Sequence, residues 1–114
     1  MTDDELVDAL KALAHPLRLR VMRALTAAER SVGQIEEAAG IGQPTLSQQL
    51  AVLRRAGLVR TRKEAKLVYY RINETALADA VVALGGLGGT APNPIPSTAP
   101  RRSAAGVANF ARLS

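Results

Sequence analysis

Apolar residues recur at intervals of three and four positions across residues 3–56, which is the period of amphipathic helices. The pattern predicts four helices there, at residues 3–14, at about 17–27 and as a pair within 32–56. After Gly57 the period changes to two, and the β-branched and aromatic runs 58–62 and 67–72 predict a β-hairpin. Helical spacing returns from residue 74 to about Leu84. The chain is therefore expected to be mainly α with a β-hairpin, in the order α-α-α-α-β-β-α.

Start and stop signals delimit the helix pair at residues 32–56. Ser31 is followed three residues later by Gln34, which is the spacing of a capping box. Gly40 is a typical helix stop, and Pro44 suits the first turn of a new helix because its missing N–H would be unpaired there anyway. Gly57 closes that second helix. Two short helices joined by a glycine-containing turn, followed by a hairpin and a last helix, predict a winged helix-turn-helix.

Helix-breaking residues dominate the chain from Gly85 onward. The Gly and Pro runs of residues 85–102 predict a flexible linker or tail. Beyond them, Val107, Phe110 and Leu113 have the spacing of a short helix that docks elsewhere. We therefore expect a winged helix-turn-helix domain at residues 1–84 and a Gly/Pro-rich tail at 85–114, flexible or with a short docked C-terminal helix.

The composition fits one globular domain. The 114 residues are 47% hydrophobic and 22% charged, which is typical of globular rather than disordered chains. No apolar run approaches the roughly 20 residues that a membrane-spanning helix needs. The acidic start at Asp3, Asp4 and Glu5 is the opposite of the basic start of a signal peptide. We expect a cytoplasmic protein with no membrane contact.

The residue types exclude several classes of chemistry. The chain has no Cys, so a disulfide, a thiolate metal site and a thiol redox switch are excluded. The single His15 directly precedes Pro16, where a place in a turn is a simpler interpretation than a metal ligand. Neither a nucleophile with its base nor a Gly-rich phosphate cradle is visible. We expect no enzyme activity, no metal and no cofactor.

The net charge of +5 is unevenly distributed. Residues 1–14 carry four acidic residues against one Lys, whereas residues 15–84 carry eleven basic against six acidic residues. The basic charge thus accompanies the helix-turn-helix, where it attracts DNA phosphates. An ordinary solvated surface is the alternative interpretation of the same charges.

The second helix of the pair has one apolar and one polar face. On a helical wheel Leu46, Leu50 and Leu53 fall together, and polar or small residues fall on the opposite half. The first residues of a recognition helix usually contact bases, while basic residues at its far end and in the hairpin suit phosphates and the minor groove. The candidates are Gln43, Thr45, Ser47 and Gln48 for bases, Arg54 and Arg55 for phosphates, and Arg62, Lys63 and Lys66 in the hairpin. A solvated surface position is the alternative for each of them, and Tyr69 and Tyr70 are more simply packing residues than base-stacking ones.

Two apolar stripes exceed what a small core needs. They are Leu6, Leu10 and Leu13 in the first helix, and Leu77, Val81 and Leu84 in the last. A symmetric dimer interface is the natural place for them, although both stripes also suit the core of the monomer. A dimer places two recognition helices about one helical turn of DNA apart, which matches an inverted repeat.

Three segments carry a resemblance to a known family. They read LKALAHPLRLRVMRAL, IGQPTLSQQLAVLRRAGLV and RKEAKLVYYRI, in this order. Together they resemble the ArsR/SmtB family of dimeric bacterial repressors over about residues 5–84, and the last two are most similar to its BigR/SqrR/HlyU branch. The resemblance implies a winged helix-turn-helix, a homodimer formed by the first and last helices, operator DNA as the ligand, and release of the DNA when an inducer changes the dimer.

The sensing sites of that family do not match this chain. Segment 31–36, where many members carry thiolate metal ligands, has no Cys, and the last helix has Asp79 but no His. Arg23 stands about where the first cysteine of the branch's dithiol pair would be, and no residue after Ile72 can be the second. The family's best-known sensor chemistries are therefore not expected here.

These observations together predict a sequence-specific DNA-binding transcriptional regulator. We expect a homodimeric repressor that binds an inverted-repeat operator in double-stranded DNA and is released by an unidentified small-molecule effector that does not act on a thiol. One alternative is a DNA-binding protein with no ligand switch. Another is a winged-helix module that binds a protein partner through its tail.

Overall fold

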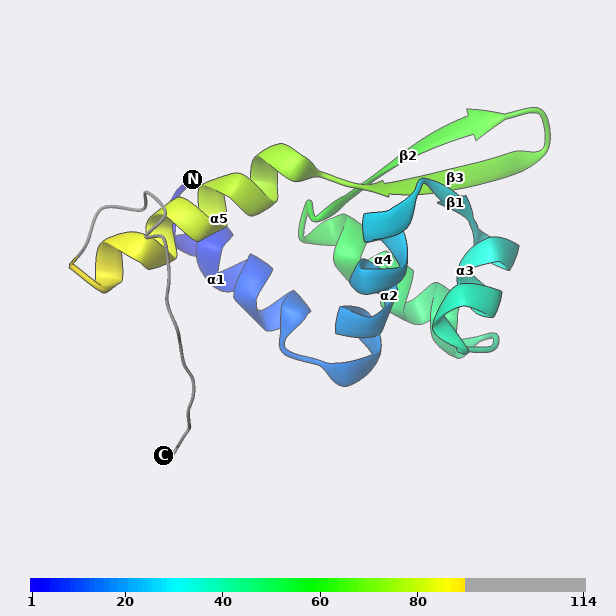
Figure 1. Ribbon diagram of the computed structural model, residues 1–114, viewed down its shortest axis with the longest axis horizontal. Coiled ribbons are helices and arrows are strands. Elements are labelled where there is room, and N and C mark those ends of the chain that lie inside the picture. The colour runs from blue at the N-terminus through cyan, green and yellow to red at the C-terminus, as the bar shows by residue number, and fades with distance from the viewer. Residues whose placement is uncertain (90–114) are drawn as a thin grey trace. The chain divides into compact units, whose positions relative to one another are not determined.

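The computed structural model describes residues 1–89 as five helices and a small sheet (Figure 1). In chain order the elements are α1 (Asp3–Leu13), α2 (Pro16–Ala27), β1 (Arg30–Ser31), α3 (Val32–Ala39), α4 (Thr45–Arg55), β2 (Val59–Glu64), β3 (Leu67–Ile72) and α5 (Glu74–Leu87). The predicted winged helix-turn-helix is confirmed. No helix within residues 1–89 is long and apolar enough to cross a membrane.

The helix boundaries follow the capping signals closely. The Ser31 hydroxyl accepts a hydrogen bond from the Gln34 backbone N–H, and the Gln34 side chain accepts one from the Ser31 N–H, at 3.3 and 2.9 Å. This capping box starts α3, and Gly40 ends it in the left-handed conformation with φ 68°. Pro44 stands directly before α4, and Gly57, with φ 77°, follows its end.

His15 acts as a helix cap in the turn between the first two helices. Its Nδ1 atom accepts a hydrogen bond from the backbone N–H of Leu17 at 3.1 Å, and Pro16 occupies the first position of α2. The cap pairs one of the free N–H groups at the helix start. The turn position predicted for His15 is therefore confirmed.

The sheet contains one strand more than predicted, in the order β1-β3-β2. The hairpin pairs Val59 with Ile72 at its base and Glu64 with Leu67 at its tip, and it projects beyond the helices as the green arm of Figure 1. The added strand β1 pairs Ser31 with Tyr69 on the outer edge of β3. Two residues are too few to show an alternating pattern, so β1 left no signal in the sequence.

The end of α5 also differs from the prediction. The helix continues to Leu87, past the predicted end at Leu84, through Gly85 and Gly86. Glycine costs a helix only about 1 kcal/mol per residue relative to alanine, so two glycines do not by themselves end one. The predicted linker beyond residue 89 and the predicted short helix at residues 103–113 lie outside the described residues.

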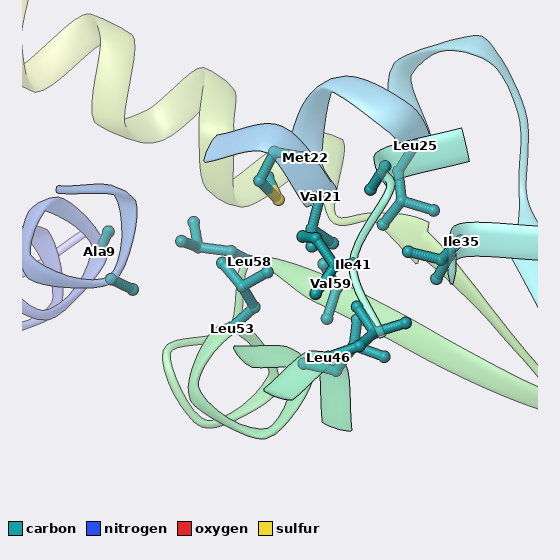
Figure 2. Packing of buried hydrophobic residues seen from close by; sticks show 13 residues of the cluster. Ala9, Val21, Met22, Leu25, Ile35, Ile41, Leu46, Leu53, Leu58 and Val59 are labelled. Atoms are coloured by element: carbon teal, nitrogen blue, oxygen red, sulfur yellow. The ribbon is translucent and has the colours of Figure 1, made fainter. Parts of the chain in front are cut away.

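One apolar core holds the helix-turn-helix and the base of the hairpin together. Figure 2 shows α2, α3, α4 and the start of β2 converging on it. The largest fully buried side chains are Val21, Ile35, Leu46, Leu50, Leu53 and Leu58. Because α4 contributes three of these six residues, its orientation is fixed by close packing against the rest of the domain.

Candidate nucleic-acid interface

The outward face of α4 is polar, and the apolar inward face anchors it. Leu46, Leu50 and Leu53 are at most 2% exposed. On the opposite side the exposed residues are Ser47, Gln48, Ala51, Arg54 and Arg55. The predicted division of this helix into two faces is therefore confirmed, and the polar face is held rigidly toward solvent.

A hydrogen-bond chain joins the first turn of α4 to α3. Gln43 Oε1 accepts hydrogen bonds from the Ser47 backbone N–H at 3.1 Å and from Ser47 Oγ at 2.7 Å. Gln43 Nε2 donates to Glu36 Oε2 at 3.3 Å. The side chains of Gln43 and Ser47, both predicted to contact bases, thus bond to each other. The third candidate there, Thr45, is half-buried as the first residue of the helix.

A surface groove runs along the polar face of α4 from its first turn to its last. Its lining comes from Ser47, Ala51, Arg54 and Arg55 on α4, and from Tyr70 on β3. The groove brings candidate base-reading and phosphate-binding residues together at the foot of the hairpin. Tyr70 also packs against the core, as the sequence predicted.

Arg62 differs from the other basic residues of the hairpin, because its guanidinium is bound within the domain. It lies 2.8 Å from a carboxylate oxygen of Glu29 and 2.6 Å from one of Glu64, and 4.7 Å from the ring centroid of Tyr69. The hydrogen bonds that Arg62 donates to Glu29 and, to a smaller extent, to Glu64 raise the pKa of Arg62 above its ordinary value. The hydrogen bond from Arg62 lowers the pKa of Glu29. Lys63 and Lys66, in contrast, are exposed near the hairpin tip.

Three arginines of α2 and β1 bind main-chain carbonyls, which the count of basic residues in the sequence did not reveal. Arg18 Nε donates to Ala12 O at 2.6 Å near the end of α1, and Arg20 Nε donates to Ala39 O at 3.1 Å at the end of α3. Arg30 Nε donates to a carbonyl of α2 at 2.9 Å. The last carbonyls of a helix lack partners within it, so these cations stabilise helix ends. Part of the basic charge is therefore structural.

The predicted dimer residues divide into two groups. Leu10, Val81 and Leu84 have exposed fractions of 37%, 62% and 41%. Leu13 and Leu77 pack against the core of the monomer, and Leu6 is half-buried. Leu13 and Leu77 therefore belong to the core of the monomer, and a dimer interface remains a prediction for the exposed residues. Two further aliphatic residues beside the stripes, Val7 and Val82, are also exposed.

The side chains of residues 1–89 do not fit a bound metal ion. Within residues 1–89 no three His, Cys, Asp or Glu side chains come together in a group that could hold one. Asp79, on α5, lines a surface groove with Glu5 and Asp8 of α1, which places the starts of the two helices near each other. Glu5 is already engaged there in the capping box of α1 with Thr2.

Several known proteins are similar to this chain in sequence and fold over most of residues 1–89. Residues 13–62 match the family model described as a helix-turn-helix domain. The biofilm growth-associated repressor of Xylella fastidiosa is 49% identical over 81 residues, which are 71% of this chain and 71% of that protein. The crystal structure of the transcriptional repressor BigR from Xylella fastidiosa has a TM-score of 0.61 at 48% identity, covering 74% of this chain and 86% of that one.

A homodimeric winged helix-turn-helix domain described as a possible ArsR-family regulator, Mb0332 from Mycobacterium bovis, is also similar. It is 32% identical with a TM-score of 0.60, covering 79% of this chain and 94% of that one. The chain belongs to the ArsR family. ArsR proteins are DNA-binding transcriptional regulators and not enzymes, and homodimerisation is typical of them. The family resemblance seen in the sequence is confirmed.

A further ArsR relative is named for the opposite regulatory effect. The transcriptional activator HlyU of Vibrio cholerae is 47% identical over 66 residues, which are 58% of this chain and 61% of that protein. Similar winged domains therefore belong both to a named repressor and to a named activator.

Proposed function

We propose that this ArsR protein is a homodimeric repressor that binds an inverted-repeat operator through α4 and the hairpin. The observation that carries the proposal is the polar face of α4, which close packing of its inward leucines holds toward solvent. The relatives named as biofilm growth-associated repressors support repression over activation, because they match 71% of this chain while the activator matches 58%.

The candidate residues take three roles in this proposal. Gln43, Thr45, Ser47 and Gln48 lie at the start of α4, the part of a recognition helix that reaches base edges in the major groove. Arg54 and Arg55 follow at its far end, within reach of phosphates. Lys63 and Lys66 extend the contact to the flanking backbone or minor groove. Arg62 orients the hairpin through Glu29 in addition to any DNA contact.

Exposed apolar side chains on α1 and α5 support the proposal of a dimer. Leu10 on α1 and Val81, Val82 and Leu84 on α5 are each at least 37% exposed, although all are aliphatic. Apolar surface of this kind is removed from water when two copies pack face to face. A two-fold dimer then presents two α4 helices to successive major grooves, which doubles the phosphate contacts and selects an inverted repeat.

The last part of the proposal is an effector that releases the DNA without reacting with a thiol of this chain. The sequence has no Cys, so neither oxidation of a cysteine pair nor a metal bound to thiolates can release the DNA through this protein. We expect diamide, persulfide, zinc and cadmium to leave the protein–DNA complex intact. Stoichiometric release by any one of them would contradict this part of the proposal.

The test is operator selection followed by substitution of two α4 residues. The wild-type chain is expected to enrich an inverted repeat from randomised duplexes, with a steep salt dependence of binding. Ser47→Ala with Gln48→Ala should abolish preference for that site while weak binding to unrelated DNA remains. Thr26→Ala, an exposed polar residue at the end of α2, is the matched control and should leave the preference unchanged. Equal losses on both DNAs would refute base reading by these residues.

A further inference from the structure

We propose that Glu36 fixes the direction of the Ser47 hydroxyl, so that Ser47 reads DNA as a hydrogen-bond acceptor. This inference rests on the proposed function, because it concerns how the same α4 face reads bases. It assigns a specificity-determining part to Glu36, a half-buried residue of α3 that the sequence did not single out. Glu36 is a positioning residue, acting on Ser47 through the amide of Gln43.

The donors and acceptors of the three side chains allow only one arrangement of the Gln43 amide. Glu36 presents a carboxylate, which only accepts hydrogen bonds, so the Gln43 atom that faces it at 3.3 Å is the amide nitrogen. The amide oxygen then faces the Ser47 backbone N–H, which only donates, at 3.1 Å. Two independent neighbours on opposite sides of Gln43 therefore require the same orientation.

The orientation of the Gln43 amide in turn determines whether the Ser47 hydroxyl offers DNA a hydrogen-bond donor or an acceptor. The Ser47 hydroxyl lies 2.7 Å from the amide oxygen of Gln43, and that oxygen can only accept a hydrogen bond. The single hydroxyl hydrogen of Ser47 is therefore directed at Gln43. The lone pairs of Ser47 Oγ remain on the exposed face of α4, so Ser47 presents an acceptor to DNA.

An acceptor in the major groove selects bases by their amino groups. Adenine and cytosine each present an amino donor there, whereas guanine and thymine present carbonyl acceptors at the corresponding position. Every base pair contains one amino base, so Ser47 does not distinguish an A·T from a G·C pair. It determines instead which strand carries the amino base. We expect adenine or cytosine on the contacted strand at the position that Ser47 reads.

Operator selection with four forms of the full chain tests this inference. Wild type and Ser47→Ala are compared first, because the operator position at which they differ is the one that Ser47 reads. Glu36→Gln keeps the shape of the side chain but can donate as well as accept, so it removes one of the two constraints and leaves the Gln43 amide held by the Ser47 N–H alone. Glu37→Gln removes the same charge from an exposed neighbouring residue of α3 and controls for weaker electrostatic repulsion of DNA.

The expected result is an amino base at the Ser47-dependent position for wild type and for Glu37→Gln. Glu36→Gln should reduce the preference for amino over carbonyl bases at that position by roughly three- to tenfold, the effect of one hydrogen bond. Preferences at other positions should stay as in wild type, which a general loss of structure would not produce.

Three results would overturn the inference alone. They are a guanine or thymine at the Ser47-dependent position in wild type, no position that depends on Ser47, and a Glu36→Gln preference equal to that of Glu37→Gln. Failure of the wild-type chain to enrich any sequence is a different outcome. It would overturn the proposed function, and this inference with it.

Discussion

Arg62 joins three parts of the domain through one side chain. Its guanidinium contacts Glu29 in the segment before β1, Glu64 at the end of β2 and the ring of Tyr69 on β3. The Arg62 side chain is 47% exposed, so water still reaches it. The contact with Glu29 links the hairpin to the helical part of the chain, and this is a structural reason for an arginine at this position.

The pair between Glu29 and Arg62 makes a specific pH dependence testable. Because Arg62 lowers the pKa of Glu29, the pair stabilises the fold above the ordinary carboxyl pKa, and this contribution is lost as the pH falls through the lowered value. Glu29→Gln should therefore unfold at lower urea than wild type near pH 7, and the difference should shrink in acid. Glu37→Gln is the matched control, and a difference that is constant with pH would contradict the assignment.

Lys63 and Lys66 provide the corresponding test for DNA contact. Replacing both with Ala should weaken binding to operator and unrelated DNA similarly, because phosphate contacts do not depend on sequence. The slope of the logarithm of affinity against the logarithm of salt concentration should fall by about one for each lysine. Lys11→Ala, an exposed lysine of α1, is the control. An unchanged slope in the double variant means that the hairpin tip does not touch phosphate.

At the scale of the element, α4 depends on the burial of its inward face. Leu50 is 2% exposed, so Leu50→Ala should lower the free energy of unfolding by about 2–5 kcal/mol. Leu67 on β3 is 51% exposed, and Leu67→Ala should change it by less than about 1 kcal/mol. Urea denaturation of the two variants checks this contrast. Equal losses would mean that the α4 packing is not as described.

Gly33 inside α3 and Gly40 at its end provide a second contrast, with opposite expected signs. Gly40 has φ 68°, and no atom lies within 4 Å of an added Cβ, so Gly40→Ala costs backbone strain alone, about 1–2 kcal/mol. Gly33 lies inside α3 with equally open space and no positive φ, so Gly33→Ala should stabilise the helix by up to about 1 kcal/mol. Thermal unfolding of both variants measures the two effects.

At the scale of the whole molecule, the proposed dimer can be tested by a substitution on an exposed apolar residue of α5. Val81 is 62% exposed in the single chain. Val81→Glu places a charge on the proposed interface, which should shift the protein toward monomer and weaken binding to the full inverted repeat more than to a half site. Thr26→Glu adds the same charge at an exposed site on α2. Sedimentation measures the assembly state, and a Val81→Glu dimer as stable as wild type would exclude this face.

Local rules account for most of what the sequence predicted correctly. The start of α3 at Ser31, its end at Gly40 and the two faces of α4 each depend on residues within a few positions of one another along the chain. The hairpin follows similarly from its alternating pattern. Because these features depend on residues close together in the chain, they can be predicted from the sequence by itself.

Tertiary structure decided the features that join distant parts of the chain. Arg62 and Glu29 lie 33 positions apart, Arg20 meets a carbonyl 19 positions away, and β1 exists only because β3 offers it an edge. A long charged side chain has many possible partners, and packing selects one of them. The sequence alone therefore determined a DNA-reading winged helix of the ArsR type. Only the fold decided which charges bind within the domain and which remain exposed.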